Sequence, residues 1–189
     1  MRFDLASFQL KWSGIVFILF GLKDKACQCY EQMLSMNPQN IYALNSLAHL
    51  KASMGLRQDA IALYKRASEC PGAQAPIFFN LAFLQEEEKD LTSAEQNFRK
   101  ALEMDSAIDR AWYGLGLVLI QLGQLDEAVA ALKQNTKLQP MSPYAWYQLA
   151  RVYMDRHEPD EALKIIQHLK GFEPKFAAQL ERETGLKAS

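Results

Sequence analysis

Large apolar and small residues recur along this chain at a fixed spacing of 34 residues. The clearest copy covers residues 109–142, where Trp112 and Leu115 begin an apolar run with the spacing of one helix face. Gly123 interrupts the run, and a second one continues to Pro140. Each copy therefore predicts two helices joined by a short turn.

The copies follow one another without insertion or deletion, so the same places can be compared between them. Five units begin at Ser7, Ile41, Ala75, Asp109 and Pro143. The eighth place of each unit holds a small residue: Gly14, Ala48, Ala82, Gly116 and Ala150. The twentieth place holds alanine: Ala26, Ala60, Ala94, Ala128 and Ala162. Four places after it stands a large residue: Tyr30, Tyr64, Phe98, Leu132 and Ile166. Two antiparallel helices approach closely only where side chains are small, and the large residue fills the space beside them. Such a period is typical of an array of paired helices.

This pattern resembles the tetratricopeptide repeat family over residues 7 to 176. The resemblance implies an all-α fold class, a right-handed α-solenoid of five helix-turn-helix repeats in a single domain, 1–189. The expected repeats are about 7–40, 41–74, 75–108, 109–142 and 143–176. A half-polar segment with Leu180 on its apolar face predicts a capping helix at about 177–184, which a repeat array needs on its last face.

The turn between the two helices of a unit favours glycine. Gly21, Gly55 and Gly123 stand where the first helix should end, a position that favours the left-handed conformation. Lys89 and His157 occupy that place in the third and fifth units. A side chain there costs about 1–2 kcal/mol if the turn is kept. We therefore expect looser turns at these two places.

Charge and cysteine content narrow the class of protein. The net charge is −1, the pI is near 6.3 and no run of Lys and Arg occurs, which argues against nucleic-acid binding. Cys27, Cys29 and Cys70 form no Cys-x2-Cys pair and are expected to be buried thiols in a reducing compartment. The apolar stretch 12–22 is followed by no signal-peptide cleavage site, so a cytoplasmic location is predicted.

The first helix differs from the others in being apolar around its whole circumference. Ile15, Ile18 and Leu19 lie in an unbroken apolar run, and such a helix is normally buried on every side. Either the short arm 1–6, a second copy, a partner or a membrane surface is expected to cover it.

Motifs that carry catalysis are missing from the sequence. It contains no glycine-rich phosphate loop, no His-Glu-x2-His and no Gly-x-Ser-x-Gly. The three histidines lie far apart, and Glu86 to Glu88 is interpreted as a solvated stretch, with an acidic binding rim as the alternative. We therefore predict no catalytic residues, no metal and no cofactor.

The resemblance places ligand-binding side chains on the first helix of each unit, along a concave groove. Rings and arginines at those places are the residue types that carry most binding energy at interfaces. The alternative is that several rings only pack between neighbouring first helices. The predicted peptide-binding residues are Tyr42, Asn45, His49, Phe79, Asn80, Phe83, Arg110, Tyr113, Leu117, Tyr144, Tyr147 and Arg151.

Three functional hypotheses follow. The first is a non-enzymatic scaffold whose groove holds a peptide or helical segment of another protein. The second is a structural subunit that self-associates, or attaches to a membrane-bound complex, through its apolar first helix. The third is a regulatory or substrate-presenting part of an enzyme whose catalytic domain lies elsewhere. The carboxylate clamp with which some family members bind chaperones is not expected, because Asn80 is the only full match and Arg110 the only conservative change.

Overall fold

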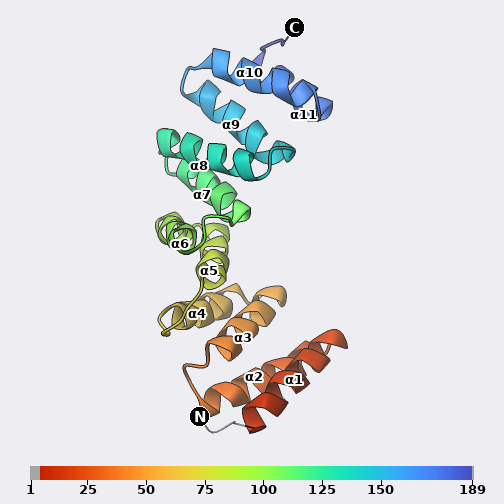
Figure 1. Cartoon of the computed structure of the whole chain (residues 1–189), viewed down its shortest axis with the longest axis vertical. Helices are drawn as coiled ribbons and strands as arrows, with labels where there is room; N and C mark the ends of the chain where they lie inside the picture. The colour runs from red at the N-terminus through yellow and green to blue at the C-terminus, as the bar shows by residue number, and fades with distance from the viewer. Residues whose placement is uncertain (1–4, 189) are drawn as a thin grey trace. The chain divides into compact units, whose positions relative to one another are not determined.

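The computed structural model describes residues 5–188, and within them the chain forms α-helices and no strand (Figure 1). The helices are α1 (Leu5–Leu19), α2 (Lys23–Met36), α3 (Ile41–Ser53), α4 (Arg57–Ser68), α5 (Ala75–Glu87), α6 (Leu91–Met104), α7 (Asp109–Gln121), α8 (Leu125–Leu138), α9 (Pro143–Asp155), α10 (Pro159–Lys170) and α11 (Pro174–Thr184). The first helices of units two to five begin at the residues that the 34-residue period predicts. The predicted all-α fold class is confirmed.

The chain divides into two compact units, residues 1–84 and 85–189. In the N-terminal unit α1 packs on α2, α2 on α3, and α3 on α4. The buried side chains of Leu44, Tyr64 and Leu81 join α3, α4 and the part of α5 up to Leu84 in one core cluster. That the two units form a single domain stays a prediction.

The C-terminal unit contains α6 to α11, and consecutive helices from α6 onward contact one another. Leu132, Leu149, Ile166 and Leu180 are fully buried and unite α8, α9, α10 and α11 in one core. The capping helix α11 contacts both α10 and α9, and it begins at Pro174, three residues before the predicted start.

The predicted close approach of paired helices is present at the small residues. Ala48, Ala60, Ala150 and Ala162 are completely buried. Gly14 is also buried, and a Cβ atom built on it would lie 2.8 Å from the Tyr30 ring. The small residues therefore stand where a larger side chain would collide with the neighbouring helix.

In the first three units the large residue of the second helix also contacts the sixth place of the next unit. Tyr30 forms a side-chain hydrogen bond with Ser46, and Tyr64 with Asn80. Burial raises the pKa of Tyr64 to about 12. In the third unit the residue is Phe98, which has no hydroxyl, and its ring fills the space above Gly114. A tyrosine thus faces a polar side chain, and the phenylalanine faces a glycine.

The two turns without glycine keep the left-handed conformation. Lys89 has φ 64° and His157 has φ 60°, close to the 75° of Gly123. The backbone hydrogen bonds are also equivalent, since Asp90 N donates to Gln85 O at 2.9 Å and Gln124 N to Leu119 O at 2.9 Å. Both places therefore keep the left-handed turn, and the expectation of looser turns is wrong, because the backbone hydrogen bonds of the turn hold these residues in the strained conformation.

Candidate functional site

On α3 the predicted binding residues differ in how far they are open to a ligand. Tyr42 is half-buried: its ring lies 6.0 Å from the Tyr30 ring, and the Lys11 ammonium group lies 4.2 Å from its centroid. Asn45 is half-buried, and its buried amide oxygen has no hydrogen-bond partner within the described residues. His49 is exposed. Of the three, His49 is the one whose side chain is open.

On α5 one ring is open and two neighbours are engaged in packing. Phe79 and Asn80 are half-buried, and the Asn80 amide bonds the hydroxyl of Tyr64. Phe83 is 48% exposed, although it is a large apolar residue. Asn80, the one full match to the chaperone clamp, is therefore occupied by a contact inside the N-terminal unit.

On α7 the predicted residues combine an exposed cation with half-buried apolar side chains. Arg110 is exposed, while Tyr113 and Leu117 are half-buried. Tyr113 forms a side-chain hydrogen bond with Gln148 of α9, and burial raises the pKa of its phenol. Tyr113 thus links two neighbouring first helices.

On α9 two tyrosines three positions apart have different environments. Tyr144 is 61% exposed and makes an edge contact to Phe176 of α11, with ring centroids 5.6 Å apart. The Tyr147 hydroxyl donates to the Glu183 carboxylate at 2.6 Å and accepts from Gln179 Nε2 at 2.9 Å. The interpretation that rings pack between first helices therefore fits Tyr113 and Tyr147, whereas Tyr144 remains open.

The capping helix supplies contacts that the sequence did not reveal. Phe176, Gln179 and Glu183 lie on one face of α11 and contact Tyr147. The hydrogen bond from Tyr147 holds the pKa of the Glu183 carboxyl below its usual range. Arg151 is exposed, with its guanidinium 5.8 Å from the centroid of the Tyr147 ring. The spacing of residues 176, 179 and 183 on one helix face was the signal that could have predicted this contact.

The apolar face predicted on α1 is largely open. Leu19 is 78% exposed and Ile18 is exposed, whereas Ile15 is half-buried. The neighbouring Trp12, Val16 and Phe20 are also exposed. Residues 1–4 of the arm expected to cover this face lie outside the described residues. No helix in the described part of the chain is both long and apolar enough to cross a bilayer.

Groups that carry redox or metal chemistry are scattered. Cys27, Cys29 and Cys70 are buried free thiols, and burial raises the pKa of Cys27 and Cys29. Within residues 5–188 no three His, Cys, Asp or Glu side chains lie close enough to hold a metal ion. The expectation that the chain is not an enzyme stays a prediction.

Comparison with known proteins identifies the repeat. A family model described as tetratricopeptide repeat matches residues 86–146, which include the α7–α8 hairpin. This chain contains a tetratricopeptide repeat. The predicted family is thereby confirmed, and the family is in general a non-catalytic interaction repeat.

Curated relatives are far longer than this chain. It is 29% identical over 65% of its length to the general transcriptional corepressor ssn6 of Schizosaccharomyces pombe, and spans 11% of that protein. It is 27% identical over 74% of its length to the human protein O-mannosyl-transferase TMTC3, and spans 16% of it. The whole-protein activities of these relatives therefore do not transfer directly.

Solved structures share the fold over almost the whole chain. A crystal structure of MamA superposes with a TM-score of 0.84 at 20% identity, covering 99% of this chain and 100% of that one. YrrB, described as a TPR protein with an unusual peptide-binding site, superposes with a TM-score of 0.82 at 16% identity over 89% of this chain and 88% of its own. At this identity the likeness shows the fold alone.

Proposed function

We propose that this chain is a non-enzymatic scaffold that binds a peptide or helical segment of another protein along its first helices. The observation that carries the proposal is the exposure of large rings there, Phe83 on α5 and Tyr144 on α9. Exposed aromatic rings on a rigid helix are the groups that most often anchor a partner. The peptide-binding site of YrrB, a protein of the same fold, is consistent with this use.

The C-terminal unit favours a ligand that combines an apolar side chain with an acidic group. Tyr144 offers an open ring, and Arg110 and Arg151 are exposed cations on α7 and α9. Arginine binds carboxylates with paired hydrogen bonds, which fixes their orientation. Tyr113 and Tyr147 support this surface, because their hydroxyls are already bonded to Gln148 and Glu183.

The test is a peptide selection followed by two matched variants. A displayed peptide library is selected against the full chain, and the best peptide is measured with wild type and with Tyr144→Ala combined with Arg151→Ala. Loss of one aromatic and one arginine anchor should weaken binding about 30- to 100-fold. Neither side chain is buried, so the fold should be retained.

The matched control changes an exposed apolar residue and an exposed arginine away from the predicted residues. Met141→Ala combined with Arg182→Ala meets this requirement, because Met141 is 66% exposed and Arg182 is exposed. This variant should bind the selected peptide like wild type. Equal affinity for all three proteins, or a loss only in the control, would disprove the proposal.

A second candidate, assembly through α1, is favoured by the apolar side chains exposed on that helix. Ile18→Glu combined with Leu19→Glu places charge on this face without touching the core of the N-terminal unit, since both side chains are exposed. If a second copy covers α1, light scattering should show an oligomer for wild type and a monomer for the variant. If a membrane-bound complex covers it, wild type should float with vesicles and the variant should not. If the wild-type chain is a monomer and does not bind vesicles, assembly through α1 is disproved.

We also propose the cytoplasmic location that the cysteines suggest. Cys27, Cys29 and Cys70 are unpaired thiols, which fits a reducing compartment. Fractionation with a tagged full chain tests this, and recovery from an oxidising compartment would contradict it.

A further inference from the structure

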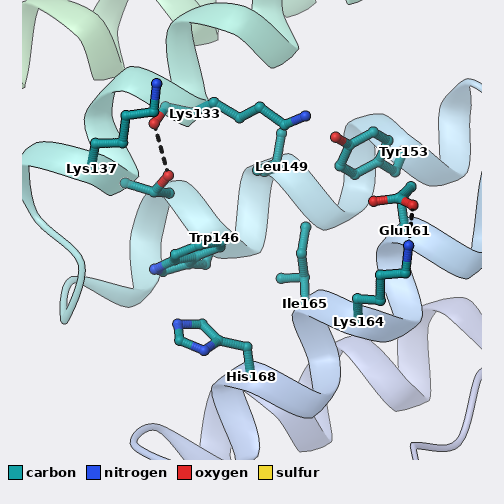
Figure 2. Close-up of a pocket in the computed structure, with 10 residues that line it drawn as sticks. Lys133, Lys137, Trp146, Leu149, Tyr153, Glu161, Lys164, Ile165 and His168 are labelled. Carbon is teal, nitrogen blue, oxygen red and sulfur yellow. Dashed lines mark hydrogen bonds and ion pairs between the residues drawn. The ribbon is translucent and has the colours of Figure 1, made fainter.

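A pocket of about 410 Å³ opens on the C-terminal unit between α8, α9 and α10 (Figure 2). Each helix contributes one face to it, with residues spaced three, four or seven apart: Lys133, Thr136 and Lys137; Trp146, Leu149 and Tyr153; Glu161, Lys164, Ile165 and His168. None of these residues is among the predicted peptide-binding residues.

The inner wall of the pocket is apolar and rigid. Leu149 and Ile165 are buried and lie between the Trp146–His168 pair and Tyr153 in Figure 2. The Trp146 and His168 rings are 4.5 Å apart, and Trp146 Nε1 donates to Pro140 O at 2.9 Å. Because these contacts fix the indole, the pocket offers a preformed surface for one large apolar side chain.

The rim of the pocket is positively charged. Three lysines line the pocket, Lys133, Lys137 and Lys164, against a single carboxylate, Glu161. Glu161 is paired with Lys164 at 2.5 Å. The Lys133 ammonium lies 5.6 Å from the Tyr153 ring centroid. Within residues 5–188 neither Lys133 nor Lys137 forms an ion pair. Two cations on this rim are thus available to an anionic ligand, although the chain as a whole is slightly acidic.

The pocket and the first-helix surface use opposite sides of α9. A helix turns by about 100° per residue, so Trp146, Leu149 and Tyr153 project away from the side that carries Tyr144 and Arg151. A ligand in the pocket can therefore bind independently of a peptide on the first helices.

We propose that this pocket binds an acidic peptide segment of a partner protein, with one large apolar side chain against Leu149 and Ile165 and its carboxylates at Lys133 and Lys137. The separated lysines favour several separate carboxylates over one phosphate group, because phosphate sites usually use arginine forks or backbone N–H groups at a helix start. Here the start of α10 already carries Asp160 and Glu161, which disfavour a phosphate there. The inference is independent of the proposed function.

The experiment measures fluorescence anisotropy of a short labelled peptide in which a central Phe is flanked on both sides by Asp and Glu. Full-chain wild type should bind it, and Lys133→Ala combined with Lys137→Ala should weaken binding about tenfold. Raising the salt concentration tenfold should weaken it as well. Lys100→Ala combined with Lys175→Ala removes the same charge from exposed positions outside the pocket, and should leave the affinity unchanged.

Three further measurements can overturn the proposal. A peptide with Asn and Gln in place of Asp and Glu should bind far more weakly; equal binding would show that the lysines play no part. The Tyr144→Ala, Arg151→Ala variant should bind the acidic peptide normally; a loss would place the peptide on the first helices instead. Phosphatidylserine vesicles should not bind through Lys133 and Lys137; vesicle binding without peptide binding would make a lipid headgroup the ligand.

Discussion

Gly114 is the position where the packing between successive units can be tested most sharply. It lies inside α7, and a Cβ atom built on it would meet the Phe98 ring at 2.5, 2.8 and 3.0 Å. Phe98 is 1% exposed, so its ring cannot move into solvent. The change Gly114→Ala therefore forces either the ring or α7 to shift.

Two opposing effects determine how much Gly114→Ala should change the stability of the chain. Overpacking a well-packed core lowers the free energy of unfolding by about 1–3 kcal/mol. Replacing glycine by alanine inside a helix raises it by about 1 kcal/mol. Because the nearest contact is far inside van der Waals distance and the ring is rigid, the packing cost should prevail. With a packing cost at the upper end, about 2–3 kcal/mol, we expect a net loss of about 1–2 kcal/mol and a melting temperature lower by about 2–8 °C.

The assay is urea and thermal unfolding of the full chain, with a rescue variant. Phe98→Leu alone should destabilise through the space it leaves. Combined with Gly114→Ala it should be more stable than Gly114→Ala alone, because the added methyl group then has room. The reasoning is refuted if Gly114→Ala is as stable as wild type, or if Phe98→Leu makes it worse by its full single-variant cost.

Three further predictions concern the turns, the buried phenols and a buried amide. His157→Gly should stabilise the chain by about 0.5–1 kcal/mol, because glycine adopts the left-handed backbone conformation of residue 157 without strain. His157→Ala should give no such gain, and the melting temperatures of the two variants test this. The pKa of Tyr64 is about 12 in the folded chain and 10 in the unfolded chain. The contribution of Tyr64 to the free energy of unfolding is therefore intact below pH 10, and the free energy of unfolding falls by about 2–3 kcal/mol as the pH approaches 12. Urea midpoints between pH 9 and 11.5 should fall less steeply for Tyr64→Phe, and equal slopes would contradict the raised pKa. Asn135→Ala should cost about 1–2 kcal/mol in urea unfolding, because the buried amide donates to Asp109 O at 2.6 Å and leaves that carbonyl without its partner; an unchanged midpoint would speak against this bond.

Much of the fold could be predicted because it depends on spacing alone. Small residues at two fixed places, such as Ala48 and Ala60, and a large one four places later leave one way to pair the helices. The left-handed turn at His157 could not be decided from sequence, because its cost is opposed by hydrogen bonds that only the folded hairpin forms. Glu158 N donates to Tyr153 O at 2.8 Å there, as the equivalent groups do in the glycine turns.

The candidate site could be predicted only in part, because tertiary contacts decide which rings are open. Tyr144 and Tyr147 are the same residue type on one helix, yet α11 bonds the hydroxyl of one and leaves the other exposed. The resemblance to the repeat family assigned both to the binding surface, because a place within the repeat does not show which neighbouring helix covers a given side chain. The basic pocket was missed for the same reason: Lys133, Trp146 and Lys164 come together only when three helices meet.

The measurement that tests the central claim most directly is amide chemical-shift mapping of the 21.5 kDa chain with a selected peptide. Binding along the first helices predicts that the shifts of residues 110–117 or 144–151 in the C-terminal unit, or of 42–49 and 79–83 in the N-terminal unit, change most. Shifts confined to α1, or to α8 and α10, would contradict it.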